Sequence, residues 1–580
     1  MLTGAPLEPI AAAGNRPDTI VERFIQRASR DPERVAFMMY PMGALQALGT
    51  LKWGDWLTAA RAASGAFLAQ HANVGDRAAI IANNRQVWPV AAMGIAMSGM
   101  ATVSIPPHGS AEMVLAQLLD SGARFLIVDT MARFKMLRAL QHRLPAPITI
   151  ICDDLEPLRS SVAEGVFEWE TWCRYGAQAL QDYEMLRDRL AERLNTIRPE
   201  HAACITYAAN SRVGVVRTFE TGVVDAEALS KGFDLTYADR IACSDLVSRP
   251  FQVSLGIDVA VVTGATVALV EHMGDAFGAA RNFDATVLAG SAQAMSQLRE
   301  TLAAAQRSGD DLRDTVCAQV GRHCRLILTA DETCGLVFQQ GLRGAGVALA
   351  TVYGTDWQTC ICVNGPTHFQ DDAIGSAFEN VAVRVGDYGE LQVARSAHTA
   401  AGCFNRSDTY DAAFSVDGQW QRTGVRVERA MSGSFRIVGE IKDMLEFSTG
   451  RLLAPQTIET SLTALLLVAH AACDADGTNS LVAVLSLNRQ AVEAWAFARG
   501  VVAPWEALVE HPLVYEELAR GVAAVNAQHE PGERINAFAP TDLEFSVHSG
   551  ELDHAGALVR TTIASRFRHV FAELHQHPPV

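Results

Sequence analysis

Strand-like and helix-like segments alternate along the chain from about residue 75, and this alternation constrains the fold more than any other feature. Short apolar strands are predicted at 77–83, 101–106 and 123–129, with helices between them at 86–100 and 110–122. Ser110 precedes the second helix as a predicted N-cap, because its hydroxyl can accept a hydrogen bond from a backbone amide of the first turn. Strands separated by helices of this kind pair mostly in parallel, so the pattern predicts an α/β fold.

The rest of the chain extends this pattern and then departs from it. Strand-helix alternation returns between residues 245 and 332, which predicts a second αβ subdomain. Beyond about residue 380 the segments become shorter and are punctuated by glycine, as is typical of antiparallel β-structure. The final stretch has strands and helices of its own, at 480–487 and 489–500. We therefore expect a large N-terminal domain (1–442) of two αβ subdomains plus a β-rich portion, followed by a small, mobile α+β domain (443–580).

Composition excludes several classes of protein. The 580 residues are too many for one hydrophobic core, and a content of 49% hydrophobic and 19% charged residues describes a well-folded chain. A formal charge of −17 argues against nucleic-acid binding. Without a signal peptide or an apolar run long enough for a membrane span, the chain is expected to be cytoplasmic. The eleven scattered cysteines predict reduced, mostly buried thiols, and no metal site is predicted.

Three ordered stretches carry a resemblance to a known family. They are "VGDRAAIIANNRQVW" and its continuation to residue 129, "RIVGEIKDMLEFSTGRLLAPQTIE" at 436–459, and "EPGERINAFAPTDLEFSVHSGELDHAGALVRTTIASRF" at 530–567. In this order they resemble the adenylate-forming superfamily of acyl-CoA synthetases, luciferases and peptide-synthetase adenylation domains, and most closely its long-chain fatty acyl-CoA ligase branch. The resemblance implies a small domain that pivots near Lys442 and Asp443, and an acyl tunnel beside residues 250–270.

The family's phosphate-gripping loop, "YTSGTTGxPKG", has an altered counterpart here. The stretch "YAANSRVGVVRTFET" occupies 207–221, and an ungapped alignment on Tyr207 and Thr221 places Val216 at the lysine. The same alignment puts Asn210, Val213 and Arg217 at the three glycines, and Ala208 and Ala209 at a Thr-Ser pair. Since glycine permits close backbone approach to phosphate, residues 208–217 are not expected to form a nest of backbone donors. Arg217 is expected to be an exposed, solvated loop arginine.

The family's "YGxTE" motif is altered in the same sense. The chain keeps Tyr353 and Gly354, which the resemblance places in the nucleotide pocket, but Trp357 stands at the glutamate that binds Mg²⁺. Asp356 could replace that glutamate only if the loop slipped by one residue.

Three more family positions carry residues of the wrong chemistry. Val425 stands at the aspartate that accepts the ribose hydroxyls, and valine accepts no hydrogen bond. Glu440 replaces an arginine beside the triphosphate, where its charge is repelled. Ala557 stands at the lysine that stabilises charge developing at the α-phosphate. By this alignment no catalytic residue is intact, and the losses fall on groups that bind phosphate, metal and ribose.

Three functional hypotheses remain open from the sequence. The favoured one is a non-adenylating pseudoenzyme that binds an acyl, acyl-CoA, carrier-protein or other protein partner. The second is an active AMP-forming fatty or aromatic acid–CoA ligase with an ATP site rewired around Asp356, Arg217 and Lys442. The third is an ATP-independent acyltransferase, for which no nucleophile can be named. ATP and Mg²⁺ lack their usual contacts, so CoA or an acyl-CoA is the better candidate for a bound cofactor.

Overall fold

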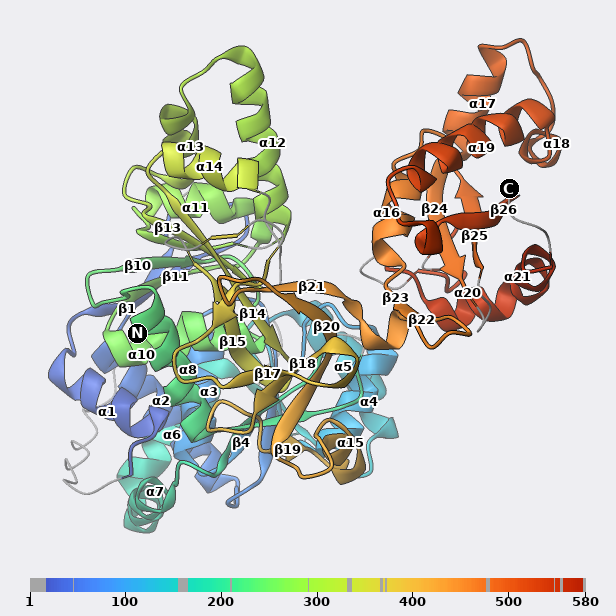
Figure 1. Cartoon of the computed structure of the whole chain (residues 1–580). Helices are drawn as coiled ribbons and strands as arrows, with labels where there is room; N and C mark the ends of the chain where they lie inside the picture. The colour runs from blue at the N-terminus through green and yellow to red at the C-terminus, as the bar shows by residue number, and fades with distance from the viewer. Residues whose placement is uncertain are drawn as a thin grey trace. The chain divides into compact units, whose positions relative to one another are not determined.

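The structure is a computed structural model that describes residues 17–576, apart from residues 45, 155–164, 209–210, 291, 331–335, 366–368, 371–372, 476–479, 547 and 553–556. The chain divides into two compact units (Figure 1). The first unit contains Met1–Arg384, Gln392–Thr423 and Arg429–Arg436. The second contains Val385–Leu391, Gly424–Glu428 and Ile437–Val580. The domain boundary at 442/443 and the pivot at Asp443 stay predictions.

An eight-stranded sheet in the first unit has the strand order β19-β9-β8-β4-β3-β5-β6-β7. The strands from β8 to β7 run parallel, whereas β9 and β19 are antiparallel to their neighbours. The strands are β3 (Arg77–Ile81), β4 (Ala101–Ser104), β5 (Phe125–Val128), β6 (Thr149–Cys152), β7 (Val166–Glu168), β8 (Ala202–Thr206), β9 (Val215–Thr218) and β19 (Gly402–Cys403). The alternation from residue 75 therefore produces the predicted parallel α/β arrangement.

Helices cover both faces of this sheet. On one face Leu118 and Leu137, from α4 and α5, pack against Val103 and neighbouring strand residues. On the other face Phe125 meets aromatic rings from α2 and α6. Ser110 caps α4 by accepting from the Met113 amide at 3.3 Å, as predicted. The helices are α1 (Ile20–Arg30), α2 (Trp53–Ala69), α3 (Val87–Met97), α4 (Ala111–Ser121), α5 (Met131–Leu140), α6 (Trp169–Asp182) and α7 (Glu184–Thr196).

A second, nine-stranded sheet has the order β16-β15-β14-β13-β12-β10-β11-β1-β2. Its middle strands are parallel, and antiparallel strands close both edges. The strands are β1 (Val35–Tyr40), β2 (Gly49–Lys52), β10 (Arg240–Cys243), β11 (Thr266–Val270), β12 (Val287–Ala289), β13 (Leu326–Ala330), β14 (Ala348–Thr355), β15 (Gln358–Asn364) and β16 (Ser376–Ala377). This is the second αβ subdomain that the sequence predicts.

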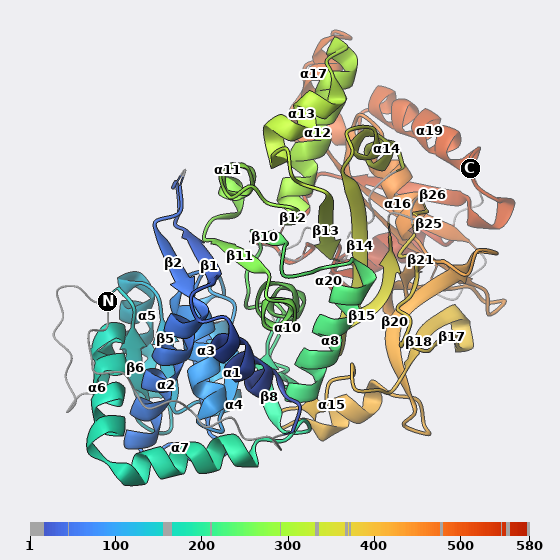
Figure 2. The same ribbon diagram turned by 90° about the vertical axis from the view of Figure 1, so that its left-hand side faces the viewer.

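The helices of this subdomain include a short irregular stretch. A single π-helical turn (Ser254–Asp258) joins α9 to α10, and α8 lies beside α10 (Figure 2). The helices are α8 (Phe219–Gly232), α9 (Pro250–Val253), α10 (Val259–Thr263), α11 (Ala276–Asn282), α12 (Ala292–Ser308), α13 (Leu312–Val320) and α14 (Leu336–Gly344). Because α8 and the π turn both border the pocket described below, their packing positions the candidate site.

A four-stranded sheet follows, with the order β17-β18-β20-β21. It is the β-rich portion expected beyond residue 380. Its strands are β17 (Val383–Val385), β18 (Glu390–Ala394), β20 (Trp420–Arg429) and β21 (Phe435–Glu440), and the same stretch contains α15 (Ser407–Ala412).

The C-terminal part of the second unit is an α+β structure around β24, β25 and β26. Strand β25 alternates between two cores: Ala483 and Leu485 join the helices α16 to α19, while Val482 and Val484 join α20 and α21 (Figure 1). This period of two lets one apolar strand support helices on both faces. The elements are β22 (Leu445–Glu446), β23 (Leu452–Leu453), α16 (Gln456–Thr463), β24 (Val468–Asp474), β25 (Leu481–Leu487), α17 (Arg489–Phe497), α18 (Trp505–Val509), α19 (Pro512–Asn526), β26 (Ile535–Thr541), α20 (Arg560–Arg566) and α21 (Arg568–Leu574).

Candidate functional site

The segment predicted as one long loop is shorter in the structure. Strands β8 and β9 pair antiparallel, with Thr206 opposite Val215, Ile205 opposite Val216 and Cys204 opposite Arg217. Only residues 207–214 connect the two strands, and residues 209 and 210 lie outside the described part of the chain. The interpretation of 208–217 as a single loop is therefore wrong, because Val215 to Thr218 form a strand.

The described ends of this connection are held by side chains rather than open to a ligand. The hydroxyl of Tyr207 donates to Asp120 Oδ2 at 2.7 Å, and burial together with this carboxylate raises the Tyr207 pKa. Gln117 Nε2 donates to the carbonyls of Ala208 and Ser211, at 3.2 and 2.8 Å. A Cβ at Gly214 would lie 2.7 Å from the Tyr207 ring, so packing against tyrosine accounts for the glycine in this segment.

Arg217 is not the exposed arginine that the sequence suggested. It is 5% exposed on β9, and its guanidinium lies 2.6 Å from Asp225 Oδ2. The same guanidinium donates to Ser254 Oγ at 3.1 Å and to the Pro250 carbonyl at 3.3 Å. The prediction failed because it placed Arg217 in a loop, whereas the strand turns the side chain inward toward α8.

Asp225 links this arginine to a distant loop. Its other oxygen, Oδ1, lies 2.8 Å from His398 Nδ1, although the two residues are 173 positions apart. The neighbouring Thr399 donates to Gln358 Oε1 at 3.2 Å. We call Arg217, Asp225, His398 and Ser254 the buried ion network. No sequence motif marked Asp225 or His398, since only the fold brings them together.

The "YGTDW" stretch forms a tight hairpin between β14 and β15. Thr355 pairs with Gln358, so Asp356 and Trp357 are the two turn residues, and Asp356 is exposed. Gly354 is required at its position, because a Cβ there would lie 2.1 Å from the Thr359 carbonyl oxygen. Tyr353 lies on the same strand, paired with Cys362. The retained Tyr-Gly pair therefore has a structural explanation in the hairpin itself.

The remaining positions assigned by resemblance lie in the second unit. Val425 is half-buried on β20, and Glu440 ends β21. Lys442 Nζ lies 2.7 Å from Glu440 Oε2, and both side chains are largely exposed. Ala557 is exposed before α20. These placements describe the residues but leave their assigned roles as predictions.

A half-buried arginine contacts the predicted pivot residue. Arg560 Nε lies 3.4 Å from Asp443 Oδ1, and the guanidinium forms a two-point contact with Glu459 at 3.0 and 2.7 Å. Glu459 Oε1 also accepts from the Cys473 amide at 2.8 Å. We call Arg560, Asp443 and Glu459 the hinge clamp. It ties the segment after β21 to α16, β24 and α20.

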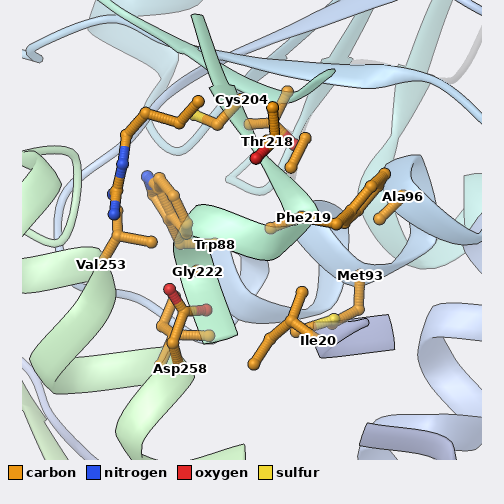
Figure 3. Close-up of a pocket in the computed structure, with 15 residues that line it drawn as sticks. Ile20, Trp88, Met93, Ala96, Cys204, Thr218, Phe219, Gly222, Val253 and Asp258 are labelled. Carbon is orange, nitrogen blue, oxygen red and sulfur yellow. The ribbon is translucent and has the colours of Figure 1, made fainter. Parts of the chain in front are cut away.

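A pocket of about 70 Å³ borders the buried ion network (Figure 3). Its walls are mostly apolar, with Asp258 and Arg217 as the charged side chains among them. The lining residues are Ile20, Trp88, Ala92, Met93, Ala96, Thr102, Ala203, Cys204, Arg217, Thr218, Phe219, Gly222, Val253, Ile257 and Asp258. The segment 250–270, expected from the resemblance to lie along an acyl tunnel, thus contributes three residues to a pocket wall.

Burial shifts the pKa of two groups at this site. Burial raises the pKa of Asp258 to about 8 and that of Cys204 to about 12. A thiol with so high a pKa carries almost no thiolate at neutral pH and is a poor nucleophile. Within the described residues no cluster of metal-ligating side chains is found, and no helix there is long and apolar enough to cross a membrane.

Sequence comparison identifies the family. Residues 24–399 match the family model described as "AMP-binding enzyme", so the chain belongs to the AMP-binding enzymes. A long-chain-fatty-acid–CoA ligase of Mycobacterium tuberculosis, FadD15, is 24% identical over 253 residues, 43% of this chain and 42% of that protein. A putative fatty-acid–CoA ligase of the same organism, fadD11, is 25% identical over 234 residues, 40% of this chain and 41% of the relative. The aligned regions thus span about two fifths of each relative.

Solved structures confirm the fold over almost the whole chain. A benzoate CoA ligase from Burkholderia xenovorans LB400 superposes with a TM-score of 0.67 at 16% identity, covering 94% of this chain and 99% of that one. A Mycobacterium tuberculosis fatty acyl CoA synthetase gives a TM-score of 0.64 at 15% identity, with coverage of 95% and 99%. At such identities the likeness shows the shared fold alone.

Proposed function

We propose that this protein is a non-adenylating member of the AMP-binding enzyme family, which binds an acyl or acyl-CoA ligand or a protein partner. The observation that carries the proposal is that Arg217 is already engaged in contacts within the protein. Each terminal nitrogen of its guanidinium donates within the buried ion network or to Pro250, so this cation is not free to meet a phosphate. Of the three residues proposed for a rewired ATP site, it is the one that comes from the stretch 207–221.

The rewired-ligase alternative also needs Asp356 and Lys442. Asp356 is an exposed turn residue, and Lys442 is paired with Glu440 on the surface. Surface pairs of this type contribute little free energy, so Lys442 could exchange partners at small cost. This alternative therefore rests on one exposed acid and one exposed lysine.

The third alternative, ATP-independent acyl transfer, needs a nucleophile. Cys204, Cys243 and Cys324 lie in apolar segments, and burial raises the pKa of each thiol. His575 lies between Asp474 and Ser480, at 2.9 and 3.1 Å, as a contact that fastens the end of α21. These contacts favour packing roles, and they support the pseudoenzyme proposal over transfer.

Calorimetric titration of the purified protein tests the proposal. We expect no heat of binding with ATP·Mg²⁺ or AMP at millimolar concentration, and binding with at least one of CoA, acyl-CoA or a fatty acid, unless the partner is a protein. Micromolar affinity for ATP·Mg²⁺ would contradict the proposal and favour the rewired ligase. Arg217 should then be probed directly, because the buried ion network would have to open for phosphate contact.

A further inference from the structure

Two polar groups on the pocket wall have no hydrogen-bond partner among the residues that the structure describes. The indole Nε1 of Trp88 is buried without a partner, and the Trp88 side chain is 2% exposed. Asp258 is 6% exposed, and it precedes α10 without capping it. None of the described residues donates a hydrogen bond to its carboxyl. Because buried polar atoms are normally paired, two such groups on one pocket wall point to a missing ligand.

The backbone around Asp258 makes room for its carboxyl. Gly222 lies inside α8, where glycine destabilises a helix, yet a Cβ there would approach Asp258 Oδ2 to 3.3 Å. Asp258 also ends the π-helical turn, and such turns occur frequently at functional sites. Figure 3 shows the carboxyl pointing into the space below the Trp88 indole. The local structure therefore keeps the acid turned into the pocket.

The charges around the pocket decide which ligand fits. The charge of Arg217 is balanced by Asp225 at 2.6 Å, and both terminal nitrogens of its guanidinium already donate hydrogen bonds. A ligand carboxylate would lose its hydration without gaining a free cation. Burial raises the pKa of Asp258 to about 8, so at neutral pH the carboxyl is mostly protonated and donates. An ammonium would then meet no anion.

We propose that this pocket binds a compact neutral molecule with an apolar body and one oxygen acceptor, a hydroxyl or carbonyl oxygen, which accepts hydrogen bonds from Trp88 Nε1 and Asp258. The volume of about 70 Å³ is several times the roughly 10–15 Å³ that one water needs, so a ring or a few carbon atoms fit. Every lining residue belongs to the first unit. The site therefore needs no residue of the second unit.

Four matched probes test this ligand chemistry: benzyl alcohol, toluene, benzoate and benzylamine. Ligand-observed NMR or calorimetry on the full-length protein at pH 7 measures the affinity of each. We expect benzyl alcohol to bind about tenfold more tightly than toluene, as one or two buried hydrogen bonds allow. Tightest binding of benzoate or benzylamine would overturn the proposal in favour of an acid or an amine site. Failure of all four to bind at millimolar concentration would also overturn it.

Substitutions test whether the two hydrogen bonds, and not packing alone, hold the ligand. Trp88→Phe and Asp258→Leu should each weaken the binding of benzyl alcohol several-fold and leave the binding of toluene almost unchanged. Asp258→Asn should still bind benzyl alcohol, because the asparagine amide also donates a hydrogen bond. A site built for an ammonium group would instead lose affinity for benzylamine with this change. Trp53→Phe is the matched control, since Trp53 Nε1 is likewise buried and unpaired but lies outside the pocket lining. If Trp88→Phe lost equal affinity for benzyl alcohol and for toluene, the hydrogen bond from the indole would be refuted.

Discussion

The guanidinium of Arg217 lies 2.6 Å from the carboxylate of Asp225, and the two side chains are only 6% and 0% exposed. The pair joins β9 to α8 at the point where the chain leaves the loop that resembles a phosphate-binding loop. A buried ion pair of this kind needs further hydrogen bonds to offset its desolvation, and Ser254, Pro250 and His398 supply them. The arginine is thereby a structural group of the fold.

Arg217→Met is expected to destabilise the protein by about 3–5 kcal/mol, because it leaves Asp225 buried without its main counter-charge. The double variant Arg217→Met/Asp225→Leu should cost less than this single change, since no unpaired charge remains. Urea unfolding followed by circular dichroism measures both. Lys231→Met is the control: its pair with Glu379 is exposed, and its loss should cost less than about 1 kcal/mol. Equal costs for Arg217→Met and Lys231→Met would contradict this account of the buried pair.

Stability should fall between pH 6 and pH 8 because of Asp258. Burial raises its folded-state pKa to about 8, far above the ordinary value of 3.8, so the folded state holds a proton that the unfolded state has lost. Each rise in pH through this window then favours unfolding, by at most about 1.4 kcal/mol per pH unit. Asp258→Asn should remove this part of the slope. Asp153, whose pKa burial raises to about 6, contributes mainly below the window. Parallel slopes for the variant and the unmodified protein would contradict the assignment to Asp258.

No acid-dependent exchange of pyrophosphate into ATP is expected with a broad panel of fatty and aromatic acids. Val216, Trp357, Val425, Glu440 and Ala557 stand at five positions whose family occupants, by resemblance, contact ATP, its metal or the developing charge. Ala557→Lys alone should not restore exchange, because the metal and ribose contacts would still be missing. Radiolabelled exchange with the unmodified protein and with this variant gives the answer. Robust exchange by the unmodified protein would contradict this prediction and favour the hypothesis of an active ligase with a rewired ATP site.

The hinge clamp should govern the stability of the second unit. Glu459→Leu removes both contacts to Arg560 and leaves the Cys473 amide without its acceptor, so a loss of about 3–5 kcal/mol is expected. Hydrogen exchange should show the change first in α16, β24 and α20. Glu493→Leu is the control, because its pair with Arg489 on α17 is exposed. Protection unchanged by Glu459→Leu would show that the clamp contributes little.

Much of the fold could be predicted from the sequence because it depends on the local periodicity of apolar residues. The alternation from residue 75 predicts β3 to β5 with their intervening helices, and Ser110 marks the start of α4 through its own hydroxyl. The shift to short β-segments beyond residue 380 is likewise a local feature. Such patterns need only neighbouring residues, so single-sequence reasoning can use them.

The loop register was not predictable in the same way. An ungapped alignment placed Arg217 at a glycine of a long loop, but β9 begins at Val215 and pairs with β8. Whether Val215 to Thr218 are loop or strand depends on β8 and β19, which lie on either side of β9 in the sheet. This segment of four residues is too short to show a periodicity that would predict the pairing. Tertiary context decided it.

By itself the sequence determined the α/β class, the order of the elements and the residues standing at the family's positions. Only the tertiary structure joined Arg217 to Asp225 and His398, set Trp88 and Asp258 on one pocket wall, and tied Asp443 to Arg560. The physical reason is separation along the chain: these partners are up to 173 residues apart, and a charge or an indole has the same local pattern whether solvated or buried. Burial, which fixes the partner of each group and raises the pKa of Asp258, exists only after the sheets have packed.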